Sequence, residues 1–387
     1  MPMDTALHTL TARIEAARTH ATPLAIRGGG SKAFYASQPD GEVLDARTLA
    51  GVLSYEPSEL VVTVGAGTPL AELEALLAAQ GQCLPFEPPH FAWSGNGAAA
   101  TVGGMVATGL AGPARASVGG VRDYVLGAKI INGLGQQLSF GGQVMKNVAG
   151  YDVSRLMVGS LGTLGLITEV SLKVLPVAPA EATLCFELAQ AQALDWLHRW
   201  GAQPLPLNAS CWVRDDSASG QPARDLLFVR LRGAVAAVEA ACRALCQDVP
   251  GTRMDNAVAG PDWARCRNQQ LPFFRQAPPG AVLWRLSLPQ TAPVLGLAWP
   301  QLVEWHGAVR WLWAPPDARA TLQQAAQAVG GQASLFYAPP DLQLAAEPRL
   351  QVQDATLATL NARLKASFDP QGLFNPALSP VPANRAA

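Results

Sequence analysis

The sequence predicts an α+β protein of two or three domains, and three observations favour this fold class. Runs of β-branched residues alternate irregularly with Ala-rich helical stretches along the chain. Of the 36 glycines, 17 fall between Gly95 and Gly165. After Pro176 the chain is poorer in glycine and richer in Trp, Pro and Ala, which indicates that a second domain begins there. With 387 residues, 49% of them hydrophobic, the chain can bury a large core.

The composition excludes several classes of protein. The net charge is −1 and only 15% of the residues are charged, so nothing suggests a nucleic-acid or anionic-membrane partner. No apolar run is long enough to span a bilayer, and the first 20 residues carry acids and lack the apolar core of a secretion signal. The six cysteines form no CxxC and no Cys/His cluster, so we expect no metal site and a cytoplasmic location.

The first 80 residues contain the clearest strand–turn–helix pattern. Leu60–Val64 is β-branched, GAG turns the chain, and Thr68 followed by a proline is typical of a helix N-cap. The predicted helix runs to about Gln80, and its start could receive an anion. Three further elements are expected before this unit: a helix at Thr5–His20 and strands at Leu24–Ile26 and Val43–Asp45.

The glycine-rich stretch predicts a hairpin and a second glycine loop. A strand at Tyr124–Ile131 turns at Gly133–Gly135 into a strand through Leu138. The segment Val153–Val158 is expected to be helical. A tight glycine loop at 159–165 and a strand at 166–174 follow.

The second half predicts a separate α+β domain, followed by a tail. The expected strands are Leu226–Arg230, Val282–Leu288 and Val309–Trp313, and the expected helices are Val235–Cys246, Ala318–Val329 and, in the tail, Leu357–Ser367. We place the domain limits at residues 1–178, 179–340 and 341–387.

The stretch RGGGSK, at Arg27–Lys32, poses the main question about function. It matches neither GxxxxGK[ST] nor GxGxxG, and a Gly-rich turn of purely structural origin remains an alternative. Three consecutive glycines also allow a ligand to approach the backbone closely.

The motifs taken in order are more specific than any one of them. RGGGS after a strand, strand–GAGTPL–helix, TVGG, VRDYVLG and GSLGTLGLITE together resemble the FAD-binding domain of the vanillyl-alcohol oxidase and p-cresol methylhydroxylase (PCMH) superfamily. The resemblance runs from about Leu24 to Pro176 and resumes at FDPQGLFNP. It implies a two-subdomain PCMH-type FAD-binding domain, an α+β cap domain, and a C-terminal tail that returns to the FAD-binding domain.

The resemblance also implies which residues hold the cofactor. The loop Gly28–Ser31 would cradle the FAD pyrophosphate with its backbone amides, with Arg27 adding charge. The full set of expected FAD contacts is Arg27, Gly28, Gly29, Gly30, Ser31, Thr101, Gly103, Gly104, Gly109, Ser117, Val118, Gly119, Gly159, Gly162, Thr163, Gly165 and Ile167. Many relatives carry a flavin-bonded His beside the glycine loop, where this chain has Ser31 and Lys32, so we expect non-covalent FAD.

Within the superfamily, the FAD-binding subunits of bacterial glycolate oxidases look most similar, on KNVAGYDVSRLMVGSLGTLGLITEVSLKVLP and VEWHGAVRWLW. Oxidising a 2-hydroxy acid requires a cation for the carboxylate and a base for the hydroxyl proton. Arg285 and Arg310 are the candidate cations and His306 is the candidate base, although each has an equally ordinary structural explanation.

This resemblance implies a function within a complex. The chain would bind FAD, oxidise glycolate to glyoxylate, and pass electrons to an iron–sulfur subunit beside a second FAD-type subunit. The His-rich metal motif of the larger subunits is missing here, so two alternatives stay open. One is a scaffold that stabilises a catalytic flavoprotein, and the other is a standalone FAD-dependent alcohol oxidase. Any attachment to the inner membrane would come through partner subunits.

Overall fold

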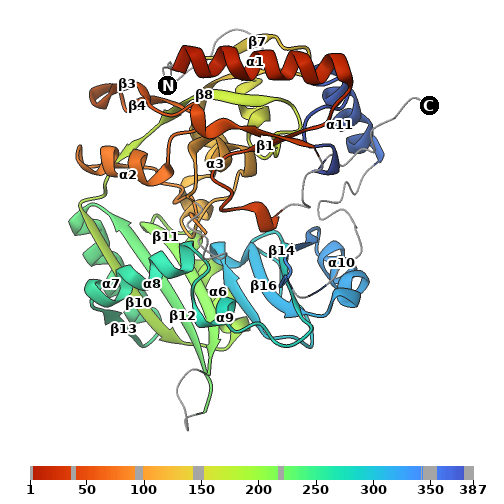
Figure 1. Ribbon diagram of the computed structural model, residues 1–387. Helices are drawn as coiled ribbons and strands as arrows, with labels where there is room; N and C mark the ends of the chain where they lie inside the picture. Colours follow the sequence, from red (N-terminus) through yellow and green to blue (C-terminus); the bar gives the residue numbers. More distant parts are fainter. Residues whose placement is uncertain are drawn as a thin grey trace.

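Figure 1 shows the computed structural model of the chain, which has two domains, one above the other in this view. The structure describes residues 3–35, 41–91, 99–142, 152–216, 222–340, 342 and 355–378. Helices and sheets occur in both domains, so the prediction of an α+β fold is confirmed. The motif KNVAGY, at 146–151, lies outside the described residues.

The N-terminal domain contains a five-stranded antiparallel sheet and two small sheets. The order of the large sheet is β3-β4-β8-β6-β7, and β6 and β7 form the predicted hairpin. Its strands are β3 (Val52–Glu56), β4 (Val61–Gly65), β6 (Val125–Ile131), β7 (Gln137–Gly141) and β8 (Leu166–Lys173). The small sheets pair β1 (Leu24–Arg27) with β2 (Glu42–Asp45) in parallel, and β5 (Gln82–Cys83) with β9 (Leu175–Pro176).

Short helices connect these strands. They are α1 (Met3–His20), α2 (Leu70–Ala78), α3 (Val102–Thr108), α4 (Arg115–Val118) and α5 (Val121–Tyr124). The predicted helical segment at 153–158 is a 3-10 helix, η4 (Ser154–Met157). The other 3-10 helices of this domain are η1 (Ala33–Tyr35), η2 (Ala46–Thr48) and η3 (Pro57–Glu59).

The start of α2 differs from the prediction. Its N-cap is Pro69, which makes no side-chain cap, while the Thr68 hydroxyl donates to Gly65 O at 2.7 Å and fixes the preceding turn. The first helical amide, Leu70 N, donates to Ala100 O at 2.8 Å. A neighbouring segment of the protein therefore occupies the helix start at which the sequence suggested an anion.

The cap domain is an eight-stranded antiparallel sheet with helices on both faces (Figure 1). The strand order is β13-β10-β12-β11-β15-β16-β14-β17. The strands are β10 (Ala180–Glu187), β11 (Leu207–Asp215), β12 (Arg224–Gly233), β13 (Gly251–Met254), β14 (Val282–Ser287), β15 (Gln301–Glu304), β16 (Val309–Ala314) and β17 (Gln332–Tyr337). The helices are α6 (Gln190–Gly201), α7 (Val235–Asp248), α8 (Asn256–Arg267), α9 (Pro272–Arg275) and α10 (Arg319–Ala328), with 3-10 turns η5 (Trp305–Gly307) and η6 (Pro316–Ala318).

Side chains alternate between the two faces of the cap sheet, because successive residues of a strand point in opposite directions. One face packs on α6, α7 and α10 through two apolar clusters. The other packs on α8 and α9 and also contacts Phe91 and Leu110 of the N-terminal domain. We call this second face the inner face. Trp305, Trp311 and Trp313 all lie in its apolar cluster.

The C-terminal segment returns to the N-terminal domain, as predicted. Helix α11 (Ala355–Phe368) precedes a short bridge between Phe374 and Leu24 of β1, and the turn η7 (Pro376–Leu378) follows. Leu24 N donates to Leu373 O at 2.7 Å, and Asn375 N donates to Leu24 O at 2.9 Å. The first strand of the chain is thereby held by one of its last described segments.

None of the helices in the described ranges is both long and apolar enough to cross a membrane. The six cysteines are free thiols, and no group of three or more His, Cys, Asp or Glu in the described part of the chain could hold a metal ion.

Candidate functional site

A cavity of about 240 Å³ lies where β1, α3 and the second glycine loop meet. The RGGGSK loop forms one wall, and the C-terminal residue Asn375 contributes to another. Of the residues predicted to bind the cofactor, eleven line it: Arg27, Gly28, Gly29, Gly30, Ser31, Thr101, Gly103, Gly104, Gly162, Gly165 and Ile167. The structure thus brings three separate sequence motifs to one cavity.

The three glycines of the loop are required for different reasons. A Cβ on Gly29 would lie 1.5 Å from Ala99 O, and one on Gly28 would lie 2.5 Å from Thr101 Oγ1. Gly30 has φ +78°, a left-handed conformation that side chains disfavour. At the first two positions the protein itself approaches the backbone closely, and this packing holds the loop against the 99–101 segment.

The loop leaves backbone donors available on the cavity side. The amides of Gly29, Gly30 and Ser31 have no acceptor among the described residues, whereas Ala33 N donates to Gly30 O. Consecutive unpaired amides form a concave site for an anion. A diphosphate is the anion that such a glycine loop suits, because its oxygens can accept several of these hydrogen bonds at once.

Lys32 is a cation of this site. From the sequence it stood out only because many relatives have a flavin-bonded histidine at this place in the loop. Lys32 lines the cavity, and no carboxylate of the described residues pairs with its ammonium. Burial, followed by repulsion from Arg267, lowers the pKa of Lys32 to about 8. A bound diphosphate would supply the missing negative charge. The position of Lys32 just after three glycines is the sequence signal that could have identified this cation.

The second glycine loop is tied to the C-terminal segment. Asn375 Nδ2 donates to Leu161 O at 2.7 Å, and Asn375 Oδ1 accepts from Ile26 N at 2.8 Å. One amide side chain therefore holds the two cavity walls together. The FDPQGLFNP motif pointed to this tail but not to the asparagine.

Six predicted cofactor residues do not line this cavity: Gly109, Ser117, Val118, Gly119, Gly159 and Thr163. Gly109 is the left-handed C-cap of α3 and lies against Gly159, since a Cβ on Gly109 would be 3.2 Å from Gly159 N. The three residues from 117 to 119 lie in and just after α4, close to the cap domain. Their assignment to FAD stays a prediction.

Arg285 lies between the two domains, as the carboxylate-binding role would require. Its guanidinium is 5.0 Å from the Trp305 ring and 5.7 Å from the Trp311 ring. Its buried Nε has no hydrogen-bond partner among the described residues. Arg285 lines a small cavity of about 20 Å³. On the side of the N-terminal domain, Phe91 and Leu110 line the same cavity.

Arg310 points to the other side of the sheet, which does not fit its predicted role. It is fully buried, and it donates to Pro293 O and Ala292 O, both at 2.7 Å. Burial lowers its pKa to about 10. Because Arg310 faces the apolar cluster around α10, we exclude it from the substrate site. Its guanidinium instead holds the backbone of the loop at 292–293.

His306 also differs from its predicted role. Its Nε2 lies 3.0 Å from Ser117 Oγ and its Nδ1 lies 3.0 Å from Ser210 Oγ, so both ring nitrogens have protein partners. Burial lowers the pKa of His306 to about 4, which keeps the ring neutral at pH 7. A histidine so engaged links the two domains and has no free nitrogen to take a substrate proton.

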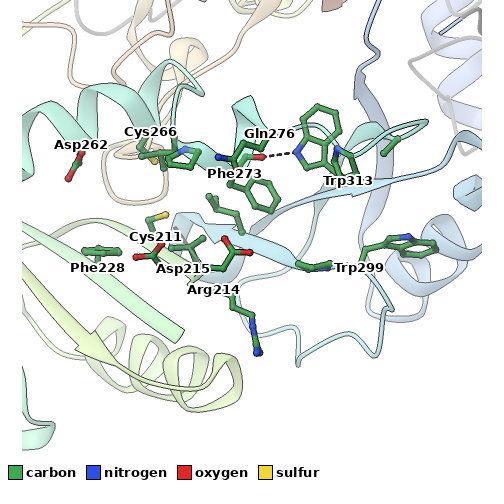
Figure 2. Close-up of a pocket in the computed structure, with 18 of the residues that line it drawn as sticks. Cys211, Arg214, Asp215, Phe228, Asp262, Cys266, Phe273, Gln276, Trp299 and Trp313 are labelled. Atoms are coloured by element: carbon green, nitrogen blue, oxygen red, sulfur yellow. Dashed lines mark hydrogen bonds between the residues drawn. The ribbon is translucent and has the colours of Figure 1, made fainter. Parts of the chain in front are cut away.

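A larger cavity than the one at the glycine loops lies elsewhere. It measures about 670 Å³ and lies in the cap domain beside α8 and α9. Figure 2 shows its aromatic walls, with the Trp313 indole N–H donating to Phe273 O at 2.7 Å, and the carboxylates Asp215 and Asp262. None of the residues predicted from the sequence lines it, so cavity size alone would have indicated the wrong site.

Comparisons with known proteins decide the family. A model described as FAD binding domain matches residues 7–141. The glycolate oxidase subunit GlcE of Escherichia coli (strain K12) is 43% identical over 367 residues, which is 95% of each chain. The chain belongs to the GlcE family of glycolate oxidase subunits. It is a flavoprotein of an oxidoreductase family, and FAD is its cofactor.

Other relatives are less similar. The glycolate oxidase subunit GlcD of Bacillus subtilis (strain 168) is 31% identical over 167 residues, 43% of this chain and 34% of that protein. Among solved structures, alkyldihydroxyacetonephosphate synthase has a TM-score of 0.64 at 15% identity, covering 95% of this chain and 75% of that one. This last likeness shows the fold alone and supports the predicted PCMH-type architecture with a cap.

Proposed function

We propose that this chain is the FAD-binding subunit of a glycolate oxidase complex, that it holds FAD without a covalent bond, and that it oxidises glycolate to glyoxylate there. The observation that carries the proposal is the glycine loop of a chain of the GlcE family. Within the described residues, the amides of Gly29–Ser31 have no acceptor and the neighbouring Lys32 has no carboxylate partner. Electrons would pass to an iron–sulfur subunit and then to a membrane acceptor. A second FAD-type subunit would complete the assembly.

The chain's own residues would divide the work between two places. The loop amides and Lys32 would balance the diphosphate, and no histidine lines that cavity, which supports non-covalent binding. Bound FAD would supply the hydride acceptor. Arg285 would hold the glycolate carboxylate with the Nε that lacks a protein partner.

The lack of a free nitrogen on His306, the candidate base, favours the scaffold alternative. Both nitrogens of His306 are occupied, and the cavity beside Arg285 measures only about 20 Å³. These two observations favour a scaffold subunit that binds FAD but depends on a catalytic partner for glycolate oxidation. The two functions differ in whether the flavin of this chain is reduced by glycolate.

The first test is a visible spectrum of the purified, desalted chain before and after acid precipitation. We expect a flavin band that moves into the supernatant. A band that stays in the pellet would reveal a covalent bond, and a protein that stays colourless with added FAD would refute the cofactor site.

Anaerobic glycolate, added to the chain alone and to the assembled complex, then tests the reaction. Bleaching only in the complex, at the partner's flavin, would favour the scaffold.

A further inference from the structure

The turn between β15 and β16 is strained and is held against the N-terminal domain. Trp305, His306 and Gly307 have φ values of +53°, +55° and +102°, which are left-handed at three successive residues. Two of these residues are not glycine, and such conformations persist only where the surroundings impose them. Here Trp305 Nε1 donates to Gly112 O at 2.9 Å, and His306 N donates to Ser210 Oγ at 3.0 Å.

The protons in this cluster can be assigned by counting donors and acceptors. Ser210 is 1% exposed, and its oxygen already accepts the His306 backbone N–H. Its single hydroxyl proton has one acceptor among the described residues, the Nδ1 of His306 at 3.0 Å. A buried hydroxyl that donates nowhere is costly, so Ser210 donates to Nδ1.

The tautomer of His306 follows from this assignment. The neutral ring carries one proton, and if Nδ1 accepts then that proton is on Nε2. Nε2–H therefore donates to Ser117 Oγ at 3.0 Å. Ser117 is exposed and keeps a hydroxyl proton of its own, which it can donate to solvent or to a bound ligand.

Two positive charges lie against the indole of Trp305, the residue before His306. Arg115, on the same short helix as Ser117, lies 4.5 Å from the Trp305 ring, and Arg285 lies 5.0 Å from that ring. No carboxylate of the described residues forms an ion pair with Arg115. The two arginines would attract a ligand that carries negative charge, and the Ser117 hydroxyl could donate to it. A carbonyl or carboxylate oxygen suits both features.

We propose that Ser210 and His306 form a hydrogen-bond relay that fixes the Nε2–H tautomer and makes Ser117 a donor to a carbonyl or carboxylate oxygen bound between the two domains. Ser210 and His306 are positioning residues in this relay, and Ser117 is the contact. The acceptor would be a flavin carbonyl or the carboxylate of a 2-hydroxy acid, an identification that rests on the proposed function.

The tautomer can be measured on the whole chain, with or without flavin. Only five histidines are present, so long-range ¹H–¹⁵N spectra of ¹⁵N-His protein can be assigned with a His306→Asn variant. We expect a neutral Nε2–H pattern for His306 at pH 7, and loss of that fixed pattern in Ser210→Ala. An Nδ1–H pattern or a protonated ring in the unaltered protein would overturn the relay. This result does not depend on whether the chain oxidises glycolate.

Binding to the holoprotein identifies the acceptor, with FAD and oxalate as probes. If the acceptor is a flavin carbonyl, Ser117→Ala weakens FAD binding about 10-fold. If it is a carboxylate, FAD binding is unchanged and the oxalate-induced shift of the flavin spectrum requires about 10-fold more oxalate. An unchanged affinity for both probes would overturn the donor role of Ser117.

Two substitutions of His306 separate the relay from simple packing. Asparagine tolerates the left-handed backbone but places no donor at the Nε2 position, whereas glutamine reaches that position. We expect His306→Gln to recover most of the binding that His306→Asn loses, at similar circular dichroism. The reverse order, with asparagine the better substitute, would indicate that only the backbone conformation matters.

Discussion

Arg285 and Arg310 show how two neighbouring arginines can have unrelated roles. In the pairing of β14 with β16, Arg285 lies opposite Trp311 and the adjacent Leu286 lies opposite Arg310. The two guanidiniums therefore leave the sheet on opposite faces. Arg285 reaches the inner face between the domains, and Arg310 donates through Nη1 and Nη2 to two backbone carbonyls on the far face. The buried Nε of each arginine has no partner among the described residues, so the face of the sheet, and not the Nε, distinguishes them.

Replacing each arginine by methionine should separate these roles. Arg285→Met should raise the KM for glycolate in the assembled complex by about 10- to 100-fold, because a charged hydrogen bond to a carboxylate is lost, and should leave FAD loading unchanged. Arg310→Met should leave KM unchanged and alter only the melting temperature. Steady-state kinetics and thermal unfolding of both variants check this, and a KM effect confined to Arg310→Met would refute the assignment.

Lys32 gives the cofactor site a pH dependence. Its folded pKa of about 8 lies below the ordinary value of 10.5, so between these values the folded chain binds fewer protons than the unfolded chain. The stability without FAD should therefore rise as pH rises through that window. A diphosphate would restore the ammonium form of Lys32.

We expect FAD binding at about pH 8 to take up roughly half a proton, and FAD affinity to fall above that pH. Calorimetric titrations in buffers of different ionisation enthalpy measure the uptake directly. Lys32→Met should abolish it and bind FAD more weakly. Equal proton uptake in both proteins would show that another group titrates.

At the scale of elements, buried ion pairs join the two domains. Glu87, after β5, accepts from Arg230 Nη2 at 2.7 and 2.8 Å and from Arg232 Nη1 at 3.2 Å. Arg232 also pairs with Glu181. Burial by itself raises the pKa of Glu87, but the charges and hydrogen bonds of the two arginines outweigh it and hold this pKa below its ordinary value. No sequence motif marked these residues.

Glu87→Gln should destabilise the protein by about 3 to 5 kcal/mol, because it leaves the buried Arg230 without its counter-charge. The matched control is Glu239→Gln, which removes the partner of Arg253 from an exposed pair and should leave the melting temperature unchanged. Since the pKa of Glu87 is depressed, its contribution is present above about pH 4.5 and is lost as pH falls below it. Equal melting temperatures for Glu87→Gln and the unaltered protein would contradict the ion-pair role.

At the scale of the whole molecule, the C-terminal segment completes the cofactor site. Asp369, which is 1% exposed, accepts from Leu373 N at 3.0 Å and from Phe374 N at 2.8 Å, and it pairs with Lys365. These contacts shape the turn that presents Asn375 to both walls of the cavity. The site therefore requires residues that are about 350 positions apart.

Asp369→Ala should release this turn and weaken FAD binding by about 10-fold or more, since two backbone donors lose their acceptor and the Lys365 ammonium loses its counter-charge. Ser367→Ala, on an exposed position of α11, is the control and should bind FAD normally. FAD titration and limited proteolysis of the tail measure the effect. Unchanged affinity with a cleaved tail would mean that the tail is dispensable for the cofactor.

Much of the architecture was determined by local sequence. The glycine loop, the hairpin of β6 and β7, and the cap strands β12, β14 and β16 were predicted because turn chemistry and β-branched runs act over a few residues. The family followed from the order of its motifs. At η4 the sequence predicted a helical segment but not its type, because one turn carries too little pattern to distinguish a 3-10 helix from an α-helix.

Only the tertiary structure decided which predicted residues share a site. A strand sequence shows alternation but not which face meets the partner domain, so Arg285 and Arg310 were equivalent until the sheet was seen. Likewise the tautomer of His306 depends on Ser210 and Ser117, which lie 96 and 189 residues away in the chain. Contacts at such separations arise from packing, and no short pattern in the sequence encodes them.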